Sequence, residues 1–231
     1  KVRAGDDDEV THCIACNQNC LGGIHTKGHV GCIQTPRSGR ETKIPHIEDL
    51  ADAPTPKRIL VVGGGPAGLS FAVTAADFGH RVTIREREAV LGGQSNIATK
   101  VDSRQEFGDA VRNLRNQLNS RDVTVETGVE VTPENVDREA WDEIVVATGA
   151  REQQPSPPLE GERVYQSWDV LGGDDVGERV IVLDNNNHAA GVGVAEQLAV
   201  DGHDVTFVTT AYHPGDRMEG TNVPPFLESL Y

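Results

Sequence analysis

The stretch from Arg58 to Glu86 constrains the fold more than any other part of the sequence. It begins with RILVV at 58–62, a continuous apolar run typical of a buried parallel strand. GGGPAG follows at 63–68, and apolar residues then recur at helical spacing until Gly79. A second strand over 81–85 ends at an acid, Glu86. A G-x-G-x-x-G motif between a strand and a helix, with an acid about twenty residues later, predicts a dinucleotide-binding unit.

Each glycine of this motif has a physical role. Gly63 permits the tight turn, Gly65 lets the backbone approach a pyrophosphate, and Gly68 lets helix and strand pack closely. The helix N-terminus offers N–H groups and the positive end of its dipole to the anion. Glu86 stands where a carboxylate accepts hydrogen bonds from ribose hydroxyls. The alternative is a glycine-rich turn that binds nothing.

The rest of the chain continues the α/β pattern. Apolar residues at helical spacing predict a helix over 104–119, and strands are expected at 123–126 and 143–147. A second unit is expected from a strand at 179–183, a helix at 192–200 and a strand at 204–208. We therefore expect an α/β protein with Rossmann-like domains, built on doubly wound parallel sheets.

The turn of the second unit differs from the first. Asp184 and three asparagines replace the glycines, and Asp184 to Gly191 spans seven steps where Gly63 to Gly68 spans five. An acid at this position repels a dinucleotide phosphate. The second turn is therefore not expected to bind a nicotinamide cofactor in the usual way.

All four cysteines of the chain lie near its start, in the spacing C-x2-C-x3-C-x11-C. Three thiolates within eight residues and a fourth after a glycine-rich stretch favour a [4Fe-4S] cluster. A structural zinc and two disulfides are the alternatives, although zinc sites usually come as two separated C-x-x-C pairs. The expected metal ligands are Cys13, Cys16, Cys20 and Cys32.

The amino-acid composition limits the possible partners of the protein and its cellular location. The net charge of −15 argues against an electrostatic nucleic-acid partner and against binding to an acidic membrane surface. The sequence has neither a membrane-span-length apolar run nor a secretion signal, so a cytoplasmic location is expected. A first residue other than Met, and an end soon after the second unit begins, suggest a piece of a longer polypeptide.

Five segments together resemble one family over nearly the whole chain: CIACNQNC with a later Cys, VVGGGPAGLSFA, LGGQ, VVATGA and VAEQLAVDGHDVTFVT. They resemble the multidomain NADH:flavin oxidoreductases, which include trimethylamine, dimethylamine and histamine dehydrogenases and 2,4-dienoyl-CoA reductase. The resemblance implies an FMN-bearing TIM barrel upstream, then the cluster loop, then two nucleotide-binding domains. It supports cluster ligation by the four cysteines. The implied FAD or ADP contacts, with their immediate neighbours, are Gly63, Gly65, Pro66, Ala67, Gly68, Glu86, Arg87, Gly93, Gln94, Ala147, Thr148 and Gly149.

The resemblance also implies a function and partners. The expected function is electron transfer from FMN through the cluster to an electron-transferring flavoprotein, in a homo-oligomeric parent enzyme. An NADPH-dependent enoate reductase segment and a non-catalytic nucleotide-binding subunit that docks on a barrel partner remain alternatives. No catalytic residue can be named. The expected divisions are 1–57 for the cluster loop and linker, 58–160 for the first domain and 161–231 for part of the second.

Overall fold

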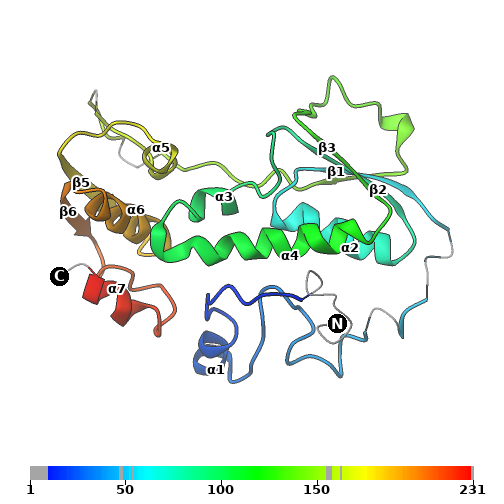
Figure 1. Ribbon diagram of the computed structural model, residues 1–231, viewed down its shortest axis with the longest axis horizontal. Helices are drawn as coiled ribbons and strands as arrows, with labels where there is room; N and C mark the ends of the chain where they lie inside the picture. Colours follow the sequence, from blue (N-terminus) through cyan, green and yellow to red (C-terminus); the bar gives the residue numbers. More distant parts are fainter. Residues whose placement is uncertain are drawn as a thin grey trace. The chain divides into compact units, whose positions relative to one another are not determined.

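The structure is a computed structural model that describes residues 10–46, 49–51, 53, 55–154, 158–161 and 163–229. The chain forms two compact units. Unit 1 comprises Lys1–Ala15, Arg40–Asn96 and Glu106–Ala150. Unit 2 comprises Cys16–Gly39, Ile97–Gln105 and Arg151–Tyr231. Figure 1 shows the helices and strands of both units, coloured along the sequence.

Unit 1 is built on a parallel sheet in the order β3-β2-β1-β4. The strands are β1 (Arg58–Val62), β2 (Arg81–Glu86), β3 (Val123–Thr127) and β4 (Glu143–Val146). All four predicted strands are present within one residue of their expected bounds, and the parallel α/β fold is confirmed. From β1 the chain adds β2 and β3 on one side of the sheet and then returns to add β4 on the other side of β1. The gap between β1 and β4 is therefore a topological switch point, where ligands of open α/β sheets bind.

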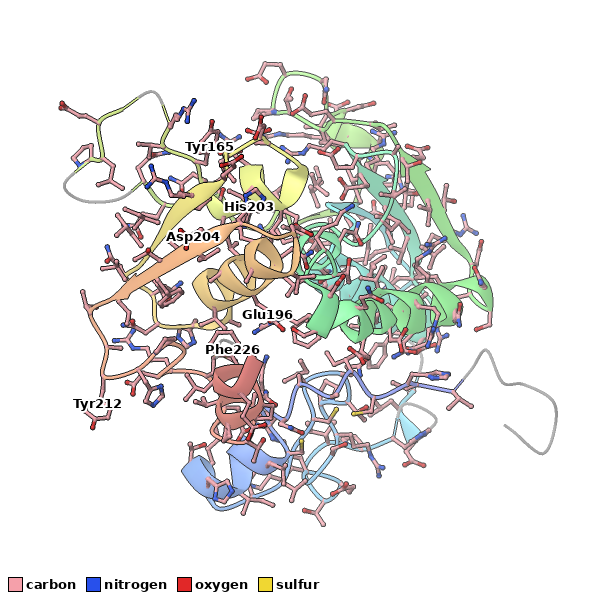
Figure 2. The ribbon with its side chains drawn as sticks, turned by 60° about the vertical axis from the view of Figure 1, so that its left-hand side comes forward. Tyr165, Glu196, His203, Asp204, Tyr212 and Phe226 are labelled. Carbon is pink, nitrogen blue, oxygen red and sulfur yellow. The ribbon has the colours of Figure 1, made fainter. Side chains whose placement is uncertain are left out.

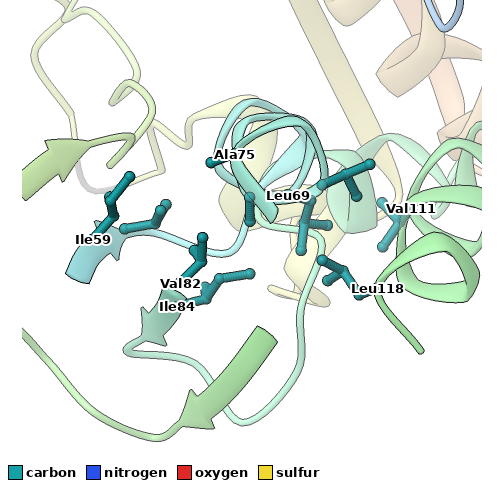
Figure 3. Packing of buried hydrophobic residues seen from close by; sticks show 10 residues of the cluster. Ile59, Leu69, Ala75, Val82, Ile84, Val111 and Leu118 are labelled. Atoms are coloured by element: carbon teal, nitrogen blue, oxygen red, sulfur yellow. The ribbon is translucent and has the colours of Figure 1, made fainter. Parts of the chain in front are cut away.

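Two helices supply the core of unit 1. They are α2 (Pro66–Asp77) and α4 (Gly108–Asn119), and the two pack on each other. Leu69 and Ile84 have no exposed surface, and Val111 and Leu118 of α4 join the same cluster. Figure 3 shows these apolar side chains from helix and strand meeting in one layer. This core holds the turn after β1 in a fixed place.

Unit 2 contains a two-stranded parallel sheet. Its strands are β5 (Arg179–Asp184) and β6 (Asp204–Thr209), with α6 (Ala189–Val200) as the crossover helix, so the predicted second βαβ unit is confirmed. Val192, Val194, Ala195 and Leu198 of α6 are buried. The short helices α5 (Ser167–Gly172) and α7 (Val223–Ser229) belong to the same unit. In Figure 2, Phe226 marks α7, where it is buried.

Three local features differ from the sequence expectations. The glycine-rich stretch after Cys20, expected as an open loop, forms the helix α1 (Leu21–Lys27), with Gly28 as a left-handed C-cap. The helix expected from residue 104 begins at Gly108, because 102–107 form the 3₁₀ segment η4 (Asp102–Phe107), in which Arg104 has a non-helical φ of −131°. The short helix α3 (Ser95–Ala98) and the 3₁₀ turn η5 (Arg138–Ala140) were not expected. The domain boundaries expected from the sequence stay a prediction.

Among the helices of the described residues, none is both long enough and apolar enough to cross a lipid bilayer.

Candidate functional site

The turn after β1 is shaped by two glycines that the fold itself requires. Gly63 has φ +110°, and a Cβ there would press on the carbonyl group of Ala147, whose carbon would lie 2.8 Å away. A Cβ on Gly68 would collide with the carbonyl oxygen of Gly63 and would lie 3.1 Å from Cγ1 of Val61. The two positions therefore allow the turn and bring the start of α2 directly onto it.

Gly65 is different, because no contact with a described residue requires a glycine there. Its φ of −76° and ψ of 177° suit any residue, and a Cβ would meet no atom of the described residues within 4 Å. Gly65 is also the N-cap of α2, where it provides no side chain to cap the helix, and Pro66 follows in the first turn. The uncapped helix N-terminus and the open space at Gly65 suit the close approach of an anion to the backbone.

Glu86 lies at the end of β2, with only 6% of its surface exposed. Its Oε2 accepts a hydrogen bond from the Gly64 N–H at 2.6 Å, and its Oε1 accepts one from the Glu88 N–H at 2.9 Å. A carboxylate has about four acceptor positions, so each oxygen can still accept from a ligand hydroxyl. Glu86 thus fixes the glycine turn as well as standing at the expected ribose position. Arg87 pairs with Glu88 at 3.1 Å, with 61% of its side chain exposed.

The LGGQ segment lies against the same turn. The Gly92 N–H donates to the Gly64 carbonyl oxygen at 2.9 Å, and a Cβ on Gly93 would lie 3.3 Å from the Gly65 Cα. Gln94 donates from Nε2 to the Ala150 carbonyl oxygen at 2.7 Å, which ties LGGQ to the loop after β4. Unit 1 therefore gathers the predicted contacts at 63–68, 86, 93–94 and 147–149 around one turn.

Three residues outside the predicted contact set also contribute to this site: Gly64, Gly92 and Ala150. A Cβ on Gly64 would press on the Leu91 side chain and lie 3.1 Å from the Glu86 Cβ, so a larger residue there would crowd both neighbours. The pair of glycines at 92–93 was a signal of this contact in the sequence. Gly92 donates its N–H to the turn, and Gly93 lies directly against Gly65. The Ala150 carbonyl group left no signal in the sequence.

The second turn, at the end of β5, is closed by its own side chains. Asp184 is 4% exposed, and its Oδ1 accepts hydrogen bonds from the N–H groups of Asn186 and Asn187, both at 3.0 Å. A Cβ on Gly191, in the first turn of α6, would lie 2.8 Å from the Asp184 Cγ. Asn187 has φ 59°, and its Oδ1 accepts from the Thr209 hydroxyl at 2.6 Å. The Asp184 carboxylate therefore packs against the third residue of α6, the position that Gly68 holds in α2, and its two N–H bonds close the loop between β5 and α6.

The four cysteines are free thiols, the ligand type that an iron-sulfur cluster needs, but their side chains do not lie together as a ligand set. None of the four forms a disulfide bond, which disfavours the disulfide alternative. The Ala15 N–H donates to the Cys13 Sγ at 3.4 Å, and Ala15 and Asn17 both have positive φ, which curls the chain between Cys13 and Cys20. Within the described ranges, no three His, Cys, Asp or Glu side chains lie close enough together to hold a metal ion. The ligand assignment stays a prediction.

Shifted pKa values occur away from the glycine turn. At the start of β1, the hydrogen bond from the Arg58 side chain lowers the pKa of Asp142, and the bond to Glu143 raises the pKa of Lys57. In unit 2, burial lowers the pKa of the Arg104 guanidinium, and the Glu196 carboxylate opposes this effect. The first two groups lie at the opposite end of the strands from the turn, so we assign them to strand pairing and name no acid–base catalyst.

Comparisons with known proteins agree with this geometry. Residues 57–189 match the family described as pyridine nucleotide-disulphide oxidoreductase. The chain is 35% identical over 208 residues to a metal reductase of Desulforamulus reducens, covering 87% of this chain and 30% of that protein. It is 32% identical over 241 residues to the N,N-dimethylglycine/sarcosine dehydrogenase of Chromohalobacter salexigens, covering 100% of this chain and 34% of that protein.

A solved structure of 2-naphthoyl-CoA reductase, in complex with 2-naphthoyl-CoA, superimposes with a TM-score of 0.90 at 28% identity, covering 100% of this chain and 34% of that one. The chain thus spans about a third of the length of the relatives it matches. The chain belongs to the pyridine nucleotide-disulphide oxidoreductase family and corresponds to part of the multidomain NADH:flavin oxidoreductases that its motifs resemble.

Proposed function

We propose that this chain is the electron-transfer part of an iron-sulfur flavoprotein oxidoreductase, in which the turn at 63–68 binds the ADP moiety of FAD, or ADP itself. One observation carries the nucleotide assignment: Gly65 faces open space although the fold does not require glycine there. The buried carboxylate of Glu86 and the uncapped start of α2 support it, because they match the ribose and the phosphates of one ligand.

The direction of electron flow is proposed from the contrast between the two turns. A nicotinamide dinucleotide at the end of β5 would meet the Asp184 carboxylate, so we propose that this unit does not accept hydride from NADPH. This favours an enzyme of the amine-dehydrogenase kind, which passes electrons from FMN on a barrel domain to an electron-transferring flavoprotein. Similarity to the N,N-dimethylglycine/sarcosine dehydrogenase agrees with this choice.

We further propose that Cys13, Cys16, Cys20 and Cys32 hold a [4Fe-4S] cluster, which when bound would supply single-electron transfer. The support is the spacing of the cysteines, their thiol state and the N–H···S bond at Cys13. Anaerobically prepared protein should be brown, should contain iron and sulfide, and should give an EPR signal on reduction. Colourless protein with stoichiometric zinc and no iron would refute this part.

The second candidate function is an NADPH-dependent enoate reductase segment. The observation in its favour is the TM-score of 0.90 to 2-naphthoyl-CoA reductase over the whole chain. Calorimetric titration separates the two candidates, with ADP and NADPH as the ligands. We expect saturable ADP binding and no saturable NADPH binding at micromolar concentrations. NADPH binding that survives ADP saturation would place a nicotinamide nucleotide at the second turn and overturn our choice.

A further inference from the structure

The peptide just before the first cysteine is held by a buried asparagine of unit 1. Asn113, on α4, is 3% exposed. Its Oδ1 accepts a hydrogen bond from the His12 N–H at 3.1 Å, and its Nδ2 donates to the His12 carbonyl oxygen at 2.9 Å. The two residues are 101 positions apart in the sequence. One amide side chain therefore satisfies both polar groups of the residue that precedes Cys13.

The helix that carries Asn113 is rigidly placed. Val111 and Leu118 are buried in the core of unit 1, and Leu114 packs against the same cluster, which also contains Leu69 of α2 (Figure 3). Asn113 lies among these apolar positions, where a hydrocarbon side chain would suit the packing and an amide must find partners to avoid a desolvation penalty. The buried amide is thus explained by its two bonds to His12.

A second asparagine holds the next cysteine within unit 2. Asn222, just before α7, donates from Nδ2 to the Cys16 carbonyl oxygen at 3.0 Å. Asn17, in the left-handed conformation, donates from its own Nδ2 to the Asn222 Oδ1 and to the Thr221 hydroxyl, both at 3.1 Å. The two asparagine side chains and the Cys16 carbonyl group form one connected network, which fixes the curl of the chain after Cys16.

We propose that Asn113 and Asn222 are positioning residues of the cysteine loop, each acting within its own unit: Asn113 fixes the backbone beside Cys13 in unit 1, and Asn222 fixes the backbone at Cys16 in unit 2. The inference about the loop rests on the hydrogen bonds alone. Its extension to a bound iron-sulfur group rests on the proposed function, because only then does the fixed backbone affect retention and reduction of the group.

The test compares Asn113→Ala and Asn222→Ala with the unchanged chain and with two exposed asparagines as matched controls, Asn119→Ala on the same helix and Asn185→Ala in the second turn. The metal-independent readout for Asn113 is amide hydrogen exchange of the peptide around His12, measured on metal-free, reduced protein. Loss of the Oδ1 acceptor should speed exchange of the His12 amide about 5- to 10-fold.

For Asn222, the metal-independent readout is the rate at which iodoacetamide alkylates Cys16, followed by mass spectrometry. We expect a change of about threefold or more in Asn222→Ala, and none in Asn185→Ala, since the loss of one hydrogen bond is worth about this factor. Exchange or alkylation rates equal to those of the unchanged chain in both variants would overturn the positioning role.

The metal-dependent readouts are the iron and sulfide retained against a chelator and the midpoint potential by EPR-monitored titration. Faster iron loss and a shifted potential in both variants, with the controls unchanged, would support the extension. If the unchanged chain binds no iron, the proposed function fails while the exchange and alkylation results still decide the loop inference. Unaltered iron retention and potential in variants with a loosened loop would refute the extension alone. Circular dichroism and thermal unfolding identify a variant that has lost its fold.

Discussion

Replacing Gly65 by alanine separates the binding role of the turn from its structural role. In the part of the chain that the structure describes, the added methyl group meets no atom within 4 Å, and the backbone angles are ordinary for alanine. Folding should therefore not suffer. By restricting the unfolded chain, such a replacement stabilises a protein by about 0.4–1 kcal/mol. The methyl group points into the space where the proposed pyrophosphate approaches the backbone.

The effect on binding follows from the same geometry. Forcing a methyl group into a filled contact typically costs about 1–3 kcal/mol, which corresponds to about 5- to 150-fold weaker ADP binding. Gly68→Ala provides the matched comparison. Its Cβ would collide with the Gly63 carbonyl oxygen and approach Val61, so it should lower the free energy of unfolding by about 1–3 kcal/mol or more.

Thermal unfolding and ADP calorimetry, run on both variants and the unchanged chain, measure the two effects separately. We expect Gly65→Ala to keep or slightly raise the melting temperature and to weaken ADP binding, and Gly68→Ala to lower the melting temperature. ADP binding to Gly65→Ala with unchanged affinity would refute the assignment of this turn to a nucleotide. A stable Gly68→Ala would refute the packing argument.

Three further predictions concern stability. Leu69→Ala should lower the free energy of unfolding by about 2–5 kcal/mol in urea, because Leu69 is fully buried, whereas Val90→Ala, at a 60% exposed site, should change it by less than about 0.5 kcal/mol. Asp184→Ala should cost about 1–3 kcal/mol, since two N–H groups of its loop lose their acceptor. Asp142→Asn should flatten the acid limb of a stability–pH curve, because the Arg58 side-chain bond depresses the folded-state pKa of Asp142. That contribution is present above the unfolded pKa and is lost as pH falls through the folded value.

Each of these has a contrary result. Equal urea midpoints for Leu69→Ala and Val90→Ala would contradict the core assignment. Unfolding of Asp184→Ala at the midpoint of the unchanged chain would show that solvent replaces the lost acceptor. Parallel stability curves for Asp142→Asn and the unchanged chain below pH 4 would mean that the pKa of Asp142 is the same in the folded and unfolded states, so that the bond with Arg58 does not lower it.

The sequence predicts those elements whose stability is local or whose pattern is continuous. The apolar run at 58–62 is a strand with its expected bounds, because a strand buried in a parallel sheet needs an uninterrupted apolar segment. The run at 179–183 is also a strand within one residue of its expected bounds, although Ile181 and Leu183 are exposed in it. The helix α1 escaped prediction, because Gly22 and Gly23 are poor helix formers. It is held by tertiary contact: a Cβ on Gly22 would meet Glu219 at 2.8 Å.

The same distinction applies to the site. The glycines at 63, 65 and 68 and the acid at 86 were predictable, because their spacing follows from one turn. The bonds from Asn113 to His12 and from Gln94 to Ala150 were not, because they join residues 101 and 56 positions apart through side chains that have many other partners available. Sequence reasoning also assigned Glu86 only to the ligand and missed its bond to Gly64.

Because the turn at Asp184 is closed and the turn at Gly65 is open, the stabilities of the two units should depend differently on the ADP concentration. A unit that binds an exchangeable anion gains stability with the logarithm of the ligand concentration, so the unit with the open turn at Gly65 should melt at a higher temperature as ADP is added. The carboxylate at the end of β5 is part of the chain and is always present. The stability of unit 2 should therefore stay constant when the ADP concentration varies.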